Sequence, residues 1–310
     1  MHPFPAIAPA VARLRGPDPV EGAPTLLFCV GATKAGTSWL YDYLSGHPDC
    51  HLRGTKELHY FDCHDLDATW ARSDVKARIA RIEEALASAG PARALDLAAE
   101  LADLKALLKL LRKPVDEAAY VAYLTEGRGE EKLVADITPA YSLLSAERLR
   151  GMAALLPDVR FLYILRDPVA RLWSHVRMMA RRRDGEGKVA RGRAARILDG
   201  VIAGRETEIA VRSDYRGALE RLNAAVDPSR VLVAFYEELL TVPGIRAVCA
   251  FLGIAERPAD LGRRVHEGVA LAMEPAQVRA ARDWLRPQYE YVERTMGRLP
   301  QSWRRALTEV

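Results

Sequence analysis

A lysine inside a glycine-containing loop is the first feature of this sequence that points to chemistry. The stretch Gly31–Ser38 reads GATKAGTS, so Lys34 lies between two glycines and is followed by two hydroxyl residues. The apolar run Leu26–Val30 before the loop indicates a buried strand, and apolar residues at helical spacing after it indicate a helix. A strand, a glycine loop and a helix in that order expose backbone N–H groups beside a positive charge. The stretch therefore predicts a binding site for a phosphate-like anion.

The same loop nearly matches the nucleotide P-loop, G-x-x-x-x-G-K-[ST]. Gly31 and Gly36 have the P-loop spacing, but Thr37 occupies the place of the P-loop lysine. A nucleoside-triphosphate kinase or ATPase is therefore one hypothesis, with Asp136 as its candidate magnesium ligand. The loop is also compatible with a non-catalytic nucleotide-binding interaction module, or with an ordinary strand-turn-helix that contains a chance lysine.

A second strand-to-helix turn offers a second contact for an anion. The apolar run Val159–Leu165 predicts another buried strand, and Arg166 follows it directly. Asp167 is suited to the cap of the next helix and Pro168 to its first turn. Ser174 would then lie two turns into that helix. Because an arginine can bind a phosphate through two N–H groups, we expect Arg166 and Ser174 to share one phosphate group.

Together the two turns resemble those of the sulfotransferases that use 3′-phosphoadenosine 5′-phosphosulfate (PAPS). The segment Thr33–Trp39 is similar to the family's 5′-phosphosulfate loop, and Tyr163–His175 is similar to its 3′-phosphate motif. Two motifs in the family's order are more specific than either one alone. The resemblance implies that PAPS is the co-substrate and that its contacts are Lys34, Ala35, Gly36, Thr37, Ser38, Trp39, Arg166, Ser174 and Tyr215.

The resemblance also implies roles for two aromatic residues. Trp39 would stack on the adenine ring, and Tyr215 would lie near the nucleotide. A place in the core is an equally good interpretation of either side chain, since large aromatic residues are usually buried. Sulfuryl transfer by these groups requires no metal, and no cluster with metal-ligand spacing occurs in the sequence.

A charged and aromatic segment after the first helix contains the candidate base. The residues Lys56–Asp62, KELHYFD, resemble the Glu-x-His-x-Phe segment of the heparan-sulfate-type sulfotransferases. The resemblance implies that Glu57 accepts the proton of the acceptor, while Lys34 stabilises the leaving phosphate oxygen. His59 is the rival base, as in the cytosolic sulfotransferases that act on phenols and steroids. Glu57 could instead be a salt-bridged surface carboxylate, and His59 a structural histidine.

A further loop resembles the acceptor loop of the family, Glu-Lys-Thr-Pro-x-Tyr. The segment Asp136–Tyr141 reads DITPAY. The resemblance implies that Thr138, Pro139 and Tyr141 contact the acceptor together with Glu57 and His59. Ile137 replaces the lysine and removes a positive charge, which argues against heparan sulfate itself. We expect a hydroxyl or amine of a saccharide-containing or small natural-product acceptor.

The length and composition of the chain indicate how these motifs are organised into a domain. It has 310 residues, long enough for one α/β domain with an insertion. We expect a single sulfotransferase domain over 1–310, built as a P-loop-like parallel sheet flanked by helices. Residues 1–24, rich in proline and alanine, would form a loose tail. Residues 67–126 would form an inserted helical hairpin, because Leu97–Leu111 contains leucines at spacings of three and four.

Net charge, cysteine spacing and hydropathy limit the kinds of partner and of cellular compartment that we expect. The net charge of +4 is too small for a typical nucleic-acid-binding protein, so we expect no nucleic-acid partner. Four cysteines without ligand-like spacing indicate thiols of a reducing compartment. No run of 18 apolar residues occurs, so we expect a cytoplasmic protein without a membrane span. The family's late Lys/Arg-Gly-Arg loop has only a poor counterpart here, Val265–Gly268.

Overall fold

A five-stranded parallel sheet forms the centre of the computed structural model, which describes residues 22–184, 191–262 and 271–308. The strand order is β2-β3-β1-β4-β5, and all four pairings are parallel. Leu27 of β1 pairs with Ala135 of β3 on one side and with Arg160 of β4 on the other. The strands are β1 (Thr25–Gly31), β2 (Cys50–Leu52), β3 (Leu133–Asp136), β4 (Val159–Leu165) and β5 (Val231–Phe235).

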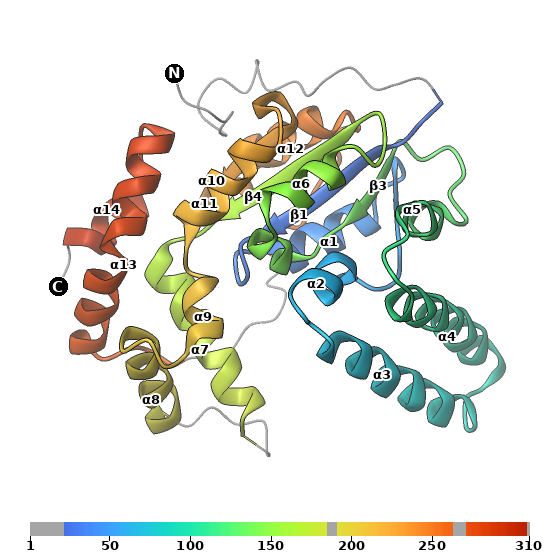
Figure 1. Ribbon diagram of the computed structural model, residues 1–310, viewed down its shortest axis with the longest axis horizontal. Coiled ribbons are helices and arrows are strands. Elements are labelled where there is room, and N and C mark those ends of the chain that lie inside the picture. Colours follow the sequence, from blue (N-terminus) through green and yellow to red (C-terminus); the bar gives the residue numbers. More distant parts are fainter. Residues whose placement is uncertain (1–21, 185–190, 263–270, 309–310) are drawn as a thin grey trace.

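Helices flank this sheet, which confirms the predicted α/β class (Figure 1). A parallel sheet covered on both faces needs apolar residues along the whole strand. Accordingly, every residue of β1, β4 and β5 is buried. The helices are α1 (Thr37–Ser45), α2 (Tyr60–Asp65), α3 (Trp70–Leu86), α4 (Pro91–Arg112), α5 (Glu117–Thr125), α6 (Ala146–Ala153), α7 (Pro168–Arg182), α8 (Arg191–Ile202), α9 (Thr207–Val211), α10 (Tyr215–Ala225), α11 (Tyr236–Leu239), α12 (Val242–Leu252), α13 (Pro275–Met296) and α14 (Gln301–Thr308), with 3₁₀ turns η2 (Pro139–Leu143) and η3 (Pro228–Arg230).

Side-chain caps fix the start of two helices, and the cap of α7 is one predicted from the sequence. Asp167 accepts a hydrogen bond from the Ala170 N–H at 2.8 Å, and Pro168 occupies the first turn of α7. Ser145 likewise caps α6, accepting from the Arg148 N–H at 3.1 Å. These short-range contacts end the loops after β3 and β4 at defined residues, so the helices start close to the sheet edge.

The chain between β2 and β3 is mostly helical. Helices α3 and α4 pack side by side, separated by Gly90, and α5 follows them before the chain returns to β3. The segment expected to be a hairpin therefore contains a third helix. Leu97, Leu104 and Leu111 of the leucine stripe are buried, as expected for an amphipathic helix that packs on its neighbours. The division into tail, insertion and single domain stays a prediction.

Some sequence-based expectations fall outside the described residues. Of the expected tail, only residues 22–24 are described, and the weak candidate Val265–Gly268 is not described at all. In the part of the chain that is described, no helix has the length and apolar character needed to cross a membrane.

Candidate active site

Four of the predicted site residues lie in segments that follow the strands at one edge of the sheet. All five strands are parallel, so the loops that follow them leave from the same edge. Lys34 follows β1 and Arg166 follows the neighbouring strand β4. Thr138 follows β3, on the other side of β1, and Glu57 lies beyond the end of β2. The strand order thus brings together Lys34 and Arg166, which are 132 positions apart in the sequence.

The Lys34 loop has a backbone that suits an anion. Lys34 and Gly36 both have left-handed backbone angles, with φ values of 71° and 88°. A Cβ atom on Gly36 would lie 2.7 Å from two ring carbons of Tyr236, so glycine is required there for space as well as for conformation. The loop ends at Thr37, where α1 begins, and the first-turn N–H groups of that helix lack intrahelical partners.

Arg166 lies directly against this loop. Its Nη1 donates to the Lys34 carbonyl oxygen at 2.9 Å, and its guanidinium carbon lies 5.1 Å from the ring centre of Tyr236. The Tyr215 hydroxyl is buried and donates to the Arg166 carbonyl oxygen at 2.6 Å. Tyr215 therefore holds the backbone of Arg166 in this structure. Ser174 is half-buried, two turns into α7.

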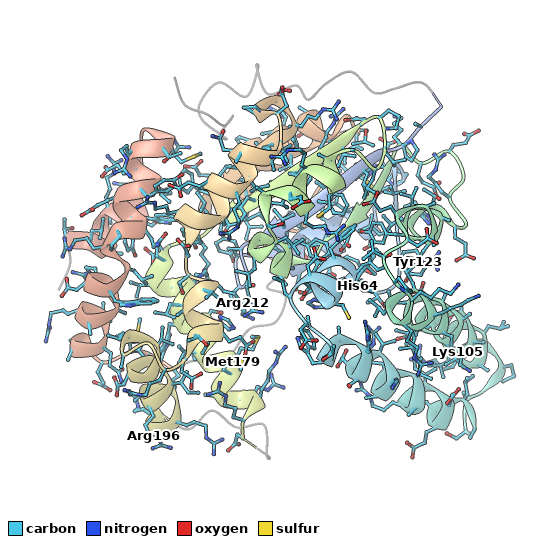
Figure 2. The ribbon with its side chains drawn as sticks, in the orientation of Figure 1. His64, Lys105, Tyr123, Met179, Arg196 and Arg212 are labelled. Atoms are coloured by element: carbon cyan, nitrogen blue, oxygen red, sulfur yellow. The ribbon has the colours of Figure 1, made fainter. Side chains whose placement is uncertain are left out.

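Two further arginines, Arg171 and Arg212, lie near Lys34 and Arg166. The fully buried Arg171 bonds the Ser213 hydroxyl, and its Nη1 lies 3.4 Å from the Thr33 carbonyl oxygen. Burial, with the charges of Arg171 and Arg212 next in importance, lowers the pKa of His175 to about 2. Figure 2 shows Arg212 beside α9, on its side toward α2.

Lys34 lies in a partly buried position beside other positive charges. Burial lowers the pKa of its ammonium group, and the charges of Arg166 and Arg182 lower it further. Burial also lowers the pKa of Arg171, whose Nε has no hydrogen-bond partner among the described residues. Like charges held together in a partly dry site repel one another, and a bound polyanion would relieve that repulsion. These residues fit a ligand with several negative charges.

The candidate base belongs to a chain of alternating charges. Lys56 contacts one carboxylate oxygen of Glu57, and His59 Nε2 lies 3.4 Å from the other. His59 Nδ1 lies 2.7 Å from the Asp62 carboxylate. Burial opposes the imidazolium, but its two carboxylate neighbours prevail and raise the pKa of His59 to about 9. Burial likewise opposes ionisation of Glu57, yet contacts with His59 and Lys56 lower its pKa to about 2. At neutral pH, Glu57 is ionised and His59 is protonated.

A buried carboxylate holds the backbone of this segment. Asp136 accepts hydrogen bonds from the hydroxyls of Thr138 at 2.6 Å and Tyr141 at 2.8 Å. Those two hydroxyls accept in turn from the backbone N–H groups of Leu58 and Tyr60, each at 3.0 Å. The bonded N–H groups lie on either side of His59, so this network fixes where the segment runs.

The hydroxyls of Thr138 and Tyr141 are therefore hydrogen-bonded to other groups of the protein. The side chains of Thr138 and Tyr141 have no exposed area, and Pro139 is also buried. Burial raises the pKa of Asp136 to about 6 despite its three hydroxyl donors, the third being Tyr120. Direct contact between these residues and an acceptor stays a prediction.

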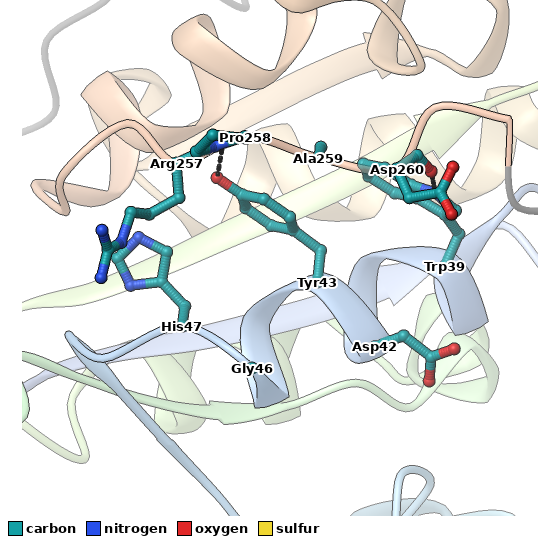
Figure 3. A pocket seen from close by; sticks show the side chains of 9 residues that line it. All are labelled: Trp39, Asp42, Tyr43, Gly46, His47, Arg257, Pro258, Ala259 and Asp260. Carbon is teal, nitrogen blue, oxygen red and sulfur yellow. Dashed lines mark hydrogen bonds between the residues drawn. The ribbon is translucent and has the colours of Figure 1, made fainter.

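Trp39 lies at the edge of a cavity beside α1 (Figure 3). The cavity measures about 370 Å³ and is lined on one side by Trp39 and Tyr43 and on the other by residues 257–260. The Trp39 indole is 6% exposed, donates to the Asp260 carbonyl oxygen at 3.1 Å and stacks on Tyr43 at 5.7 Å. Its stacking on adenine stays a prediction.

Tyr236 and Arg182 are among the residues of the site that were absent from the sequence-based set. Tyr236 directly follows β5, so the rule that located Lys34 and Arg166 at strand ends could also have indicated it. Arg182 is the last residue of α7, and its spacing from Arg171 and His175 places the three on one helix face. Only the position of α7 beside the loop made that face relevant.

Comparison with known proteins identifies the family. A family model described as "Sulfotransferase family" matches residues 24–258, about three quarters of the chain. The chain belongs to the sulfotransferase family. This sulfotransferase is an enzyme, and membership decides against the kinase, ATPase and non-catalytic hypotheses. The matched region contains the Lys34 loop, Glu57, Arg166 and Tyr236.

Two solved structures share the fold of this sulfotransferase. The sulfotransferase from Alicyclobacillus acidocaldarius is 24% identical with a TM-score of 0.62, and the match covers 91% of this chain and 100% of that one. The sulfotransferase domain from the Synechococcus PCC 7002 olefin synthase is 20% identical with a TM-score of 0.52, covering 92% and 99%. No curated protein matches the chain.

Proposed function

We propose that the sulfuryl donor is PAPS and that the Lys34 loop, with Ala35, Gly36, Thr37 and Ser38, binds its phosphosulfate. The observation that carries the proposal is the cluster of cations at the N-terminus of α1, in which the pKa of Lys34 is lowered. A ligand with several negative charges offsets the repulsion within that cluster. Arg166 and Ser174 would bind the 3′-phosphate, while Trp39 and Tyr215 would border the adenosine.

The second part of the proposal concerns proton transfer. The acceptor oxygen or nitrogen forms a bond to sulfur as the bond between sulfur and the 5′-phosphate oxygen breaks, and the acceptor's proton passes to Glu57. Lys34 stabilises the charge that develops on the leaving phosphate oxygen. The charges of Glu57 and Lys34 influence one another, which supports their lying in one site.

The ionisation states favour Glu57 over His59 as the base. His59, whose pKa is raised to about 9, has no free lone pair at neutral pH. Glu57 is ionised, although a pKa of about 2 makes it a weak base. The negative charges of a bound donor raise the pKa of a nearby carboxyl group, so donor binding would make Glu57 a stronger base.

The acceptor remains defined by its reacting group, a hydroxyl or amine of a saccharide-containing or small natural-product molecule. Thr138 and Tyr141 support the segment that contains Glu57 and His59, because their hydroxyls accept hydrogen bonds from the backbone N–H groups of Leu58 and Tyr60. We therefore place the acceptor beside that segment, with its reacting atom between Glu57 and Lys34.

Calorimetry with adenosine 3′,5′-bisphosphate tests the donor site. The wild-type protein should bind this nucleotide without magnesium, and Lys34→Ala should weaken binding about 10- to 100-fold, the value of a charge-assisted hydrogen bond. Lys132→Ala is the matched control, because Lys132 is 60% exposed and precedes β3 at the opposite edge of the sheet. Equal losses in both variants, or magnesium-dependent binding of ATP instead, would refute the donor assignment.

The base is tested separately with Glu57→Gln. We expect sulfuryl transfer to fall about 10²- to 10⁴-fold, while adenosine 3′,5′-bisphosphate binds at least as tightly as to the wild type, because a negative charge near the nucleotide is removed. Full activity in this variant would eliminate Glu57 as the base.

A further inference from the structure

An exposed tryptophan contacts His59, the neighbour of the candidate base. Trp70, the first residue of α3, is 51% exposed. Among the exposed large apolar side chains of the described residues it is the one aromatic ring. Exposed single apolar residues are common, but half-exposed tryptophans adjoining a charged site are typical of binding surfaces.

The contact of Trp70 connects it to the chemistry of the site. Its ring centre lies 4.6 Å from that of His59, with an angle of 68° between the two planes. His59 in turn lies 3.4 Å from the Glu57 carboxylate. The two rings meet edge to face, an arrangement that aromatic pairs prefer, so His59 holds the orientation of Trp70.

The turn between α2 and α3 directs the indole to this place. Asp67 has a left-handed backbone with φ 52°, and its carbonyl oxygen accepts from the Thr69 N–H at 2.7 Å. The next residue after Trp70, Ala71, is buried against the protein, so α3 begins with the indole on its outer side. Figure 1 shows this end of α3 next to α2, the helix that follows His59.

From this arrangement we infer that Trp70 is the platform for the acceptor, and that the acceptor contains a ring whose face packs on the indole. The inference rests on the proposed function, because it places the reacting hydroxyl or amine beside Glu57. A flat aromatic ring would stack on Trp70, and a saturated or sugar ring would lay its C–H face on the same surface. A linear chain presents no such face.

Three primary alcohols with seven carbon atoms each separate these cases. Benzyl alcohol has an aromatic ring, cyclohexylmethanol has a saturated ring, and 1-heptanol has neither. Their binding to the complex of the full-length protein with adenosine 3′,5′-bisphosphate is measured by saturation-transfer NMR titration. The same titrations use Trp70→Ala, Trp70→Phe and, as a control, Leu95→Ala, which alters an exposed apolar residue on α4.

We expect at least one cyclic alcohol to bind the wild type more tightly than 1-heptanol. Trp70→Ala should weaken that binding about tenfold, equal to about 1.4 kcal/mol. Trp70→Phe should retain part of the affinity, and Leu95→Ala should retain all of it. Preference for one cyclic alcohol over the other identifies the kind of ring.

Two results would overturn the inference: no cyclic preference in the wild type, or equal binding of the cyclic alcohols by Trp70→Ala. An exposed surface for a protein partner would give the second result. Failure of the donor assignment is recognised independently, because the wild type would then not bind adenosine 3′,5′-bisphosphate in calorimetry.

Discussion

Replacing Gly36 by alanine tests the geometry of the Lys34 loop. The φ of Gly36 is 88°, and a left-handed backbone costs an L-residue about 1–2 kcal/mol. The added methyl group would also lie 2.7 Å from two ring carbons of Tyr236, and overpacking of this kind costs about 1–3 kcal/mol. We therefore expect Gly36→Ala to lower the free energy of unfolding by about 2–5 kcal/mol.

The same substitution should also affect the ligand. Tyr236 cannot move without disturbing Arg166, whose guanidinium lies over its ring. The loop that contains Lys34 would shift with it, since Arg166 bonds the Lys34 carbonyl oxygen. We expect the affinity for adenosine 3′,5′-bisphosphate to fall at least tenfold, equal to about 1.4 kcal/mol.

Two control variants separate the causes. Gly204 has a similar φ of 74° but no atom within 4 Å of a new Cβ, so Gly204→Ala should cost about 1–2 kcal/mol without altering nucleotide binding. Gly90→Ala has neither strain nor a close neighbour and should be nearly neutral. Urea unfolding and calorimetry measure the two quantities. The reasoning is refuted if Gly36→Ala binds the nucleotide as tightly as the wild type.

Three further predictions follow from the same contacts. Folding raises the pKa of His59 to about 9, so protonated His59 stabilises the folded protein fully below pH 6.5, and this stabilisation is lost as the pH rises through about 9. In urea unfolding, the free energy of unfolding of the wild type should fall by about 3 kcal/mol over that range relative to His59→Gln. Thr138→Val removes the acceptor for the Leu58 N–H and should lower kcat about tenfold with donor affinity unchanged, whereas direct contact with the acceptor would raise KM instead. Asp158→Ala leaves the buried Arg160 guanidinium without its carboxylate and should lower the free energy of unfolding by about 3–5 kcal/mol in urea; a loss under about 1 kcal/mol would contradict this account.

Local patterns were enough to predict strands β1 and β4 and the start of helix α7. The apolar runs of β1 and β4 appear in the structure within one residue of their predicted bounds. Asp167 caps α7 as predicted. Each of these features depends on neighbours along the chain, on burial of a contiguous run or on a side chain three residues from its partner. Such interactions are present in the sequence itself.

The charge states of the site required the tertiary structure. Residue types identified Glu57 and His59 as rival candidates for the base, but only the contacts with Lys56 and Asp62 show which group is protonated. A pKa depends on burial and on charges within a few ångströms, and neither can be read from spacing along the chain. The hydrogen bonds of buried Thr138 with Asp136 and Leu58 could not be predicted either, because Leu58 is far from Thr138 along the chain.

The sequence by itself determined two strand-to-helix turns, an α/β class and the chemical types of the candidate site residues. Only the tertiary structure decided that β1 lies between β3 and β4, so that Lys34 and Arg166 touch. It also decided that α3 places Trp70 against His59. Strand order and helix packing arise from burial of apolar faces between segments far apart in the chain. A local pattern specifies that such a face exists, but not which partner covers it.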